Sequence, residues 1–458
     1  MSPRKQRTRR DWSAFINSDS EDVEAYVESE SETTDASPTY EHCVDYPLDR
    51  KRPSEQYFDE LARKYAAEVA AELASEITFS DSKHHPTPEM DELVEPPTKQ
   101  PRTDNDNQKT RKYALLLAYE GSNYAGLQIQ PDVETVESVL HRALLDTDLY
   151  HPSKPCLQAS RVSRAGRTDK GVSAAGNVLS GNFIETEPEI VRSLLNAHLP
   201  SDIRILNCTR VTPSFDARKS GTSRHYEYMM PEDVLKPSSA DNWSLSDAGL
   251  EDFASLLQDF VGTHNFFNFT AQLGPTDPKC KRDILEVTVD RFQIPGVSIP
   301  FVIVKFHGRS FLLHQIRKMI GTAIAVSKCM LPRNYIKEAL LAQKHLPTPK
   351  APSEGLLLDY VEFYYYFEKF GDRVDDGFYN HEERLLFKKE VLYQSMAERI
   401  LKNDVFGEFI TSLNTDQLSL IFDDYMRNKE IKDELIKKKT VKLTAEQIAQ
   451  MKASRPSN

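Results

Sequence analysis

Apolar residues recur with two different periods along the chain from about residue 111. Runs with the character of β-strands cover 113–119, 203–211, 225–230, 284–292 and 301–306. Apolar residues at helical spacing cover 133–145, 190–199, 250–261 and 311–328. Strands and helices that alternate in this way predict an α+β fold, with strands in both halves of the region.

Helical spacing continues toward the end of the chain. Two helices are predicted over roughly 380–414 and 416–438, and three lysines at 437–439 close the second one. Positive charge is favourable at a helix C-terminus. The aromatic run 363–367 precedes these helices, and such a run more often packs in a core than stacks on RNA bases. Residues 368–458 are therefore predicted to be a C-terminal helical extension with a basic end.

The first 110 residues show a different pattern. Residues 1–53 contain a long Ser, Asp and Glu run with little apolar surface to bury, which is typical of disorder. Residues 54–77 carry apolar side chains at helical spacing and predict one amphipathic helix. Residues 78–110 are rich in Pro, Asp and Asn. Residues 1–110 are therefore predicted to form a largely disordered acidic tail with one helix.

Charge separates this tail from the rest of the chain. The whole chain has 458 residues and a formal net charge of −12. Residues 1–110 carry 14 Lys and Arg against 25 Asp and Glu, which leaves the remainder nearly neutral. The acidic balance therefore does not exclude a nucleic-acid partner. Basic clusters at 4–10 and 50–53 fit a nuclear import signal or a nucleic-acid arm, and they equally fit a solvated charge run.

Cations in the nearly neutral part of the chain gather beside a few motifs. Clusters of this kind predict a basic stripe that tracks a nucleic-acid backbone, with scattered solvated charges as the alternative. The clustered cations are Arg161, Arg164, Arg167, Lys170, Arg218, Lys219, Arg224, Arg309, Arg317 and Lys318.

Cysteine and apolar content narrow the class of protein. The five cysteines lie far apart, without a CxxC pair, which favours a reducing compartment and gives no zinc signature. No metal ligand is therefore assigned, and a structural metal has no signature in the sequence. No apolar run reaches the length of a membrane span, so no membrane partner is expected.

The segment Ala165–Val172 carries the most informative chemistry. Asp169 lies between two cations, Arg167 and Lys170, and glycines bracket the group. Glycines permit a tight loop whose backbone approaches a ligand closely. Flanking cations favour an ionised carboxylate and attract phosphate. By itself the segment also fits a surface turn with incidental charges. Motifs elsewhere in the chain are needed to distinguish a functional loop from such a turn.

The segment resembles the signature loop of the TruA family of tRNA pseudouridine synthases, in which the Asp is the catalytic nucleophile. Three further stretches match in the order that this family shows: Tyr119–Gln128, Phe215–Arg218 with Arg224–Tyr228, and Phe311–Gly321. In chain order these are the first, third and fourth motifs, and Ala165–Val172 is the second. Gly262–Phe266 and Gly355–Leu358 are most like the eukaryotic branch of the family. The resemblance covers about 111–367. Ser173 and Leu127 depart from the family pattern. These two departures affect the expected local packing and not the nucleophile.

The resemblance implies a fold and a reaction. It implies two similar sheet-bearing lobes, 111–212 and 213–367, which share a mainly antiparallel sheet with a catalytic cleft between them. It also implies an isomerase that acts on uridines of tRNA, with the anticodon stem-loop region as the expected target and messenger and small nuclear RNA as further substrates. The chemistry requires no cofactor. A monomer and a nuclear location are expected.

The resemblance further implies roles for five residues. Asp169 is the nucleophile, and Arg317 matches the family arginine that pairs with it. Tyr226 matches the family tyrosine that packs on the base and serves in proton removal. Arg167 is a candidate for holding the phosphate backbone or filling the vacated stack, and Arg218 for binding phosphate at the rim of the cleft.

Two other functions remain as alternatives. A non-enzymatic RNA-binding or chaperone protein on the same fold would be free to lose Asp169, and this chain keeps it together with Tyr226 and Arg317. A DNA-binding regulator is suggested by the basic clusters alone and lacks a recognisable DNA-reading motif. The sequence therefore favours the enzyme, but it does not name the uridines that are modified.

Overall fold

The structure is a computed structural model that describes residues 108–152, 155–237, 243–271, 273–371, 381–413, 418 and 420–434. The predicted tail with its helix over 54–77 and the lysines at 437–439 lie outside the described residues. Within the described ranges, no helix is both long and apolar enough to cross a bilayer.

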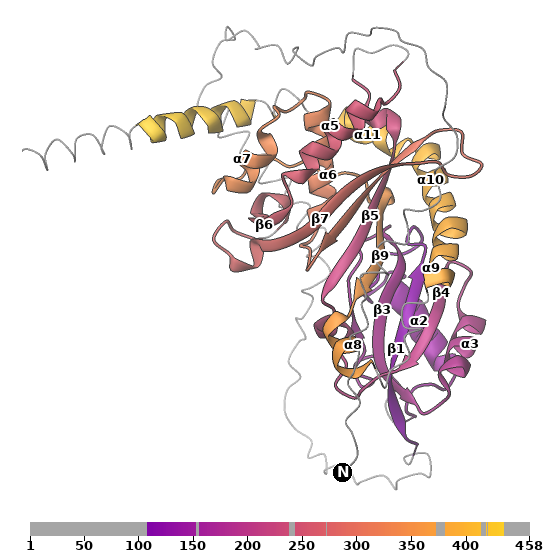
Figure 1. Ribbon diagram of the computed structural model, residues 1–458. Helices are drawn as coiled ribbons and strands as arrows, with labels where there is room; N and C mark the ends of the chain where they lie inside the picture. The colour runs from indigo at the N-terminus through magenta and orange to yellow at the C-terminus, as the bar shows by residue number, and fades with distance from the viewer. Residues whose placement is uncertain are drawn as a thin grey trace, which may run out of the picture. The chain divides into compact units, whose positions relative to one another are not determined.

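Strands from the whole described region form one sheet (Figure 1). Its order is β4-β1-β3-β9-β5-β8-β7-β6, and β2 pairs with β3. The pairs are antiparallel except β3 with β9. The strands are β1 (Thr110–Tyr119), β2 (Ser163–Arg164), β3 (Ser173–Ile184), β4 (Ile203–Arg210), β5 (Ser223–Pro231), β6 (Gly262–Asn265), β7 (Lys281–Phe292), β8 (Phe301–Gly308) and β9 (Leu356–Glu362). The predicted α+β class with a mainly antiparallel sheet is confirmed.

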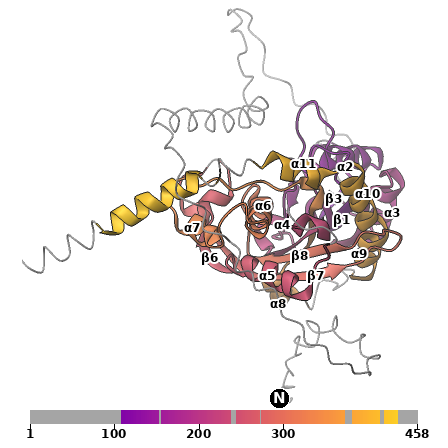
Figure 2. The same ribbon diagram turned by 90° about the horizontal axis from the view of Figure 1, so that it is seen from above.

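Helices pack around this sheet, and α6 lies in contact with α5 and α7 (Figure 2). A short π-helical turn, Lys388–Leu392, joins α9 to α10. The helices are α2 (Val136–Asp146), α3 (Pro188–His198), α4 (Ala217–Ser220), α5 (Asp247–Gln258), α6 (Gln315–Ser327), α7 (Tyr335–Leu341), α8 (Tyr364–Phe370), α9 (His381–Phe387), α10 (Tyr393–Lys402) and α11 (Val405–Ser412). Residues 420–434 are also helical.

Buried apolar side chains form two clusters, and β9 contributes to both. One cluster is built mainly on β1, β3, β4, α2 and α3, and it includes Leu358 of β9. The other is built mainly on β5, β7, β8 and the helices α5 to α7, and it includes Leu356 and Leu357. Side chains on successive strand positions point to opposite faces, and burial on both faces stabilises β9 in the middle of the sheet.

The helix of the fourth motif, Phe311–Gly321, begins later than the apolar pattern predicts. Apolar spacing predicts a helix over 311–328, whereas α6 begins at Gln315. The cause is His314, whose backbone is left-handed with φ 62°. A left-handed residue cannot continue a right-handed helix, so 311–314 form a turn that enters α6.

The aromatic run 363–367 divides between core and surface. Phe363 and Tyr366 are buried, whereas Tyr364 and Tyr365 are 60% and 68% exposed. The run forms the start of α8, and helical geometry places positions three apart on one face. The predicted core role therefore holds for one face of this helix only.

Candidate active site

Asp169 lies in the loop between β2 and β3, and the first motif is fastened to that loop. The Leu127 backbone N–H donates to the Thr168 carbonyl at 3.2 Å, and the Gly171 N–H donates to the Tyr124 carbonyl at 3.3 Å. Gly126 has φ 101°, and a Cβ there would lie 2.8 Å from the Thr168 carbonyl oxygen. Glycine is therefore required at 126, because any side chain would push the loop away.

Buried polar side chains hold the loop from the other side. The side-chain amide of Asn177 donates to the Gly166 carbonyl at 3.0 Å and accepts from the Gly166 N–H at 3.3 Å. The Tyr119 hydroxyl and Thr168 Oγ1 share a hydrogen bond of 2.7 Å. Asn177 and Tyr119 have no exposed surface. Satisfied buried polar networks are rigid, so the backbone beside Asp169 is fixed before a ligand arrives.

The two departures from the family pattern both have packing roles. Ser173 is buried, and its hydroxyl oxygen accepts the Gly121 backbone N–H at 3.0 Å. Leu127 is fully buried in the cluster built on β1 and β3. Both side chains thus connect the first motif to the core.

The Asp169 carboxylate faces an imidazole. Oδ2 of Asp169 lies 3.7 Å from Nε2 of His314, and the side chains are 31% and 8% exposed. The left-handed turn at His314 brings the ring to this position. The sequence contains His314 within the fourth motif, but the expected helix over 311–328 gave no reason to assign it a role.

Arg317 lies one turn further along and has a different partner. Its Nε donates to the Ala351 carbonyl at 2.7 Å, and the Ala351 N–H donates back to the Arg317 carbonyl at 3.0 Å. Among the described residues, no ion pair joins Arg317 to Asp169. The expected pairing is therefore not formed in this structure, because the guanidinium is turned to the segment that precedes β9.

Tyr226 lies beside the nucleophile loop on β5. A Cβ at Gly166 would meet the Tyr226 hydroxyl at 3.7 Å. The Tyr226 ring packs edge-on against Phe311, with centroids 5.1 Å apart. Burial raises the pKa of the Tyr226 hydroxyl to about 12, and the Asp169 charge adds to this rise. By contrast, Tyr228 is fully buried and donates to the Pro352 carbonyl at 2.8 Å, which is a core role.

The predicted phosphate-binding residues are exposed. Arg167 is exposed beside Asp169, and Arg218 and Lys219 are exposed on α4. Asp216 caps α4 by accepting the backbone N–H groups of Arg218 and Lys219 at 3.0 Å each. The third motif therefore fixes the backbone of two solvent-facing cations.

Two other clustered cations serve the scaffold. Arg224 donates to the Ala165 carbonyl at 3.0 Å and to the Arg309 carbonyl at 2.9 Å, which joins the nucleophile loop to the residue that follows β8. Arg164 pairs with the fully buried Glu137 of α2 at 2.5 Å. These two residues fit neither a phosphate-binding stripe nor scattered solvated charges, because protein groups already engage both guanidinium groups.

A hollow of about 640 Å³ opens between α2 and α3. Its lining includes Glu134, Asp146 and Asp202 and does not include Asp169. Three carboxylates disfavour a polyanion, so this hollow does not fit RNA.

Comparisons with known proteins identify relatives of this chain. A profile of the family described as tRNA pseudouridine synthase matches residues 256–364. The tRNA pseudouridine synthase 1 of Candida glabrata is 30% identical over 72% of this chain and 74% of its own length. The chain belongs to the tRNA pseudouridine synthase family. The pseudouridylate synthase 1 homolog of mouse is 37% identical over 60% of this chain, and that of human is 35% identical over 62%.

The family profile covers only part of the candidate site of this tRNA pseudouridine synthase. The profile covers His314 and Arg317 but not the loop with Asp169. The alignments span 64% of the mouse relative and 68% of the human one. The roles of single residues therefore rest on the motifs and on the geometry.

Proposed function

We propose that the protein isomerises uridine to pseudouridine in tRNA and that Asp169 is the nucleophile. Family membership supports the reaction. The single observation that supports the nucleophile is the placement of Asp169 on a fastened loop, with His314 at 3.7 Å and Tyr226 beside the same loop.

The reaction rearranges bonds without oxidation or reduction. The bond from C1′ of the ribose to N1 of uracil breaks, the base turns, and C1′ bonds to C5. The base loses the C5 proton, and N1 ends with one proton. A carboxylate that attacks the nucleotide forms a transient covalent intermediate, which divides one difficult step into easier ones. In this proposal Asp169 provides that carboxylate.

The other residues hold the nucleotide and the nucleophile. A uridine inside folded RNA must leave its stack to react, which costs a few kcal/mol. In our proposal Tyr226, supported by Phe311, packs on the extruded base. Arg167 and Arg218 bind phosphates through their exposed guanidinium groups. Arg317 keeps a role in the active site by fixing the segment around Ala351.

The RNA lies between the two halves of the chain in this proposal. Asp169 comes from 111–212, whereas Tyr226 and His314 come from 213–367. One hydrophobic cluster is built mainly on the first of these halves and the other mainly on the second, which supports two lobes around a cleft. One chain carries all of these residues, so we propose a monomeric enzyme.

The test measures loss of the C5 proton. A tRNA transcript that carries tritium at C5 of uridine releases tritium when pseudouridine forms. Asp169→Asn keeps the shape and removes the nucleophilic charge, so we expect release to fall to background while filter binding of tRNA persists. Asp290→Asn, which changes an exposed carboxylate on β7, is expected to keep full release. Turnover by Asp169→Asn above background would exclude this residue as nucleophile.

We further propose uridines of messenger and small nuclear RNA as substrates and the nucleus as the location. The support is the eukaryotic character of the motifs and the basic clusters near the N-terminus. Nucleoside mapping of cellular RNA after deletion of the gene tests the substrates. Imaging of tagged protein with and without residues 1–53 tests the location, and unchanged nuclear enrichment would place the import signal elsewhere.

A further inference from the structure

Two tyrosine rings at the start of α8 are exposed to solvent, although their neighbours in the chain lie in the core. Tyr364 and Tyr365, here called the tyrosine pair, are 60% and 68% exposed, whereas Phe363 and Tyr366 are buried. The two exposed rings lie edge to face, with centroids 5.4 Å apart. Single exposed apolar side chains are common, but adjacent large ones often mark a binding surface.

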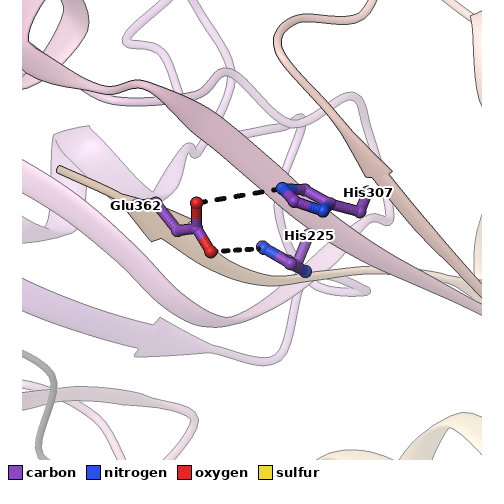
Figure 3. Close-up of side chains that lie close together, drawn as sticks. All are labelled: His225, His307 and Glu362. Carbon is purple, nitrogen blue, oxygen red and sulfur yellow. Dashed lines mark hydrogen bonds and ion pairs between the residues drawn. The ribbon is translucent and has the colours of Figure 1, made fainter. Parts of the chain in front are cut away.

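Hydrogen bonds fix the junction between β9 and α8. The Tyr364 backbone N–H donates to Oγ1 of Thr222 at 3.3 Å, and the Thr222 N–H donates to the Glu362 carbonyl at 2.7 Å. The Glu362 carboxylate accepts the Ser223 hydroxyl at 2.5 Å and lies 3.0 Å from Nε2 of His225. Figure 3 shows that this carboxylate faces two imidazole rings. The tyrosine pair is therefore displayed on a rigid support.

The buried face of α8 packs on the third motif. The centroid of the Phe215 ring lies 5.5 Å from that of Phe363 and 4.6 Å from that of Tyr366. Phe215 lies two residues before α4, the helix with two solvent-facing cations. The tyrosine pair and these cations therefore rest on the same packed unit.

The exposed charges of this surface are mainly positive. Arg218 and Lys219 of α4 are exposed, and Lys369 is exposed one helical turn after Tyr365. Residues four apart lie on the same face of a helix. Glu368 is the only carboxylate within the ranges of α4 and α8, and the structure describes both ranges completely. Three cations against one carboxylate favour a polyanionic partner.

The same surface is bonded to the nucleophile loop. Arg224 lies two residues after Thr222 and donates to the Ala165 carbonyl at 3.0 Å. Ala165 lies four residues before Asp169 in the second motif. Arg224 also donates to the Arg218 carbonyl at 3.4 Å. An RNA that places a uridine at Asp169 can therefore extend over α4 and the start of α8.

We propose that Tyr364 and Tyr365 form a stacking platform for an unpaired base of the tRNA substrate, beside phosphates held by Arg218 and Lys219. This inference rests on the proposed function, because it takes tRNA as the substrate. Aromatic rings stack on unpaired bases of any identity, and neighbouring cations hold the backbone. The positive charge favours RNA over an apolar protein segment. The platform thus adds affinity for the RNA without reading its sequence.

The first test measures the tRNA affinity of the full-length chain by filter binding. Replacing both tyrosines by Ala should weaken binding on the order of 10-fold, because a stacked base is lost. Replacing both by Phe keeps the rings and should preserve the affinity, whereas replacing both by Leu keeps only apolar bulk and should not. Leu341→Ala is the matched control, since it changes a 71% exposed side chain of α7 and should bind like the wild type.

Two further measurements separate stacking from charge. The slope of log affinity against log salt should be the same in the double Ala variant and the wild type, whereas Arg218→Gln should flatten it by roughly 0.7–0.9. Transcripts with one 4-thiouridine at an unpaired position are crosslinked to the wild-type chain by light. We expect an adduct at 364–365 from at least one such position, and this result decides if the double Ala variant fails to fold.

Unchanged affinity in the double Ala variant would overturn the platform and favour a protein partner for the tyrosine pair. A loss that the Phe pair shares with the Ala pair would also overturn it, as would crosslinks confined to other segments. Tritium release by the wild type is measured in parallel. Release together with unchanged affinity of the Ala pair contradicts the platform alone, whereas a wild type without release contradicts the proposed function.

Discussion

At the scale of a single residue, the left-handed backbone of His314 places its imidazole beside Asp169. Left-handed φ values are uncommon for residues other than Gly, and Asn tolerates them better than most. Asn at position 314 should therefore keep the left-handed turn that precedes α6. The same substitution removes the imidazole beside Asp169.

We predict that His314→Asn lowers turnover on the order of 100-fold, because a displaced catalytic group loses the geometry that it was held in. The fall should appear in kcat, with little change in KM or in melting temperature. Tritium release and a thermal melt measure both. His264→Gln, which changes a half-buried histidine of β6, is the control. A normal kcat in a folded His314→Asn enzyme would show that the imidazole does not position Asp169.

The motifs in the sequence named candidate residues for the site but did not predict all of their contacts. Asp169, Tyr226 and Arg317 were all predicted from ordered motifs, and Tyr226 lies beside the Asp169 loop. The expected partner of Asp169 was Arg317, whereas the structure places His314 there. A left-handed residue inside an apolar pattern leaves no periodic signal.

At the scale of elements, the nucleophile loop depends on its contact with the first motif. Gly126 has no room for a side chain against the Thr168 carbonyl, and its φ of 101° is unfavourable for other residues. The position of Asp169 thus depends on a glycine in a different segment.

We predict that Gly126→Ala lowers kcat by more than 10-fold and lowers the melting temperature, because the added Cβ displaces the loop or strains the backbone on the order of 1–3 kcal/mol. Gly274→Ala is the matched control, since a Cβ there would meet nothing within 4 Å. Steady-state kinetics and thermal melts test both variants. Equal behaviour of the two alanines would contradict the proposed support of the loop.

Element boundaries were predicted where the apolar pattern was simple. The strands β1, β4, β5, β7 and β8 and the helices α2, α3 and α5 fall where periodicity predicts them, within a few residues. Strand β3 was not predicted, although most of it is buried. Its buried residues include Ser173, Asn177 and Ser180, and these polar side chains hide the apolar signal of a central strand.

At the scale of the whole molecule, a buried charge network joins the C-terminal helices to the sheet. Lys388 donates to Glu227 at 2.9 Å and to Asp359 at 3.0 Å, and Tyr393 donates to Glu227 at 2.7 Å. Burial acts to raise the pKa of Asp359, but Lys388 and Arg384 more than offset it, so the pKa lies below its usual range. The network therefore remains charged.

We predict that Lys388→Met destabilises the protein by about 3–5 kcal/mol, because it leaves two buried carboxylates without their shared cation. Lys389→Met changes the exposed neighbour and should have almost no effect. Urea unfolding measures both. Adding Glu227→Gln to Lys388→Met should recover part of the loss. A Lys388→Met protein as stable as Lys389→Met would mean that the helices dock without this network.

The central position of β9 has a consequence for synthesis. It is the last of the described strands in chain order, yet it lies between β3 and β5. The ribosome makes the chain from its N-terminus. One edge of β3 and one edge of β5 therefore lack a partner strand until residue 362 has left the ribosome. Unpaired edges invite pairing with other chains. A nascent chain stalled before residue 356 is therefore expected to require chaperones, and the sheet closes at its centre last.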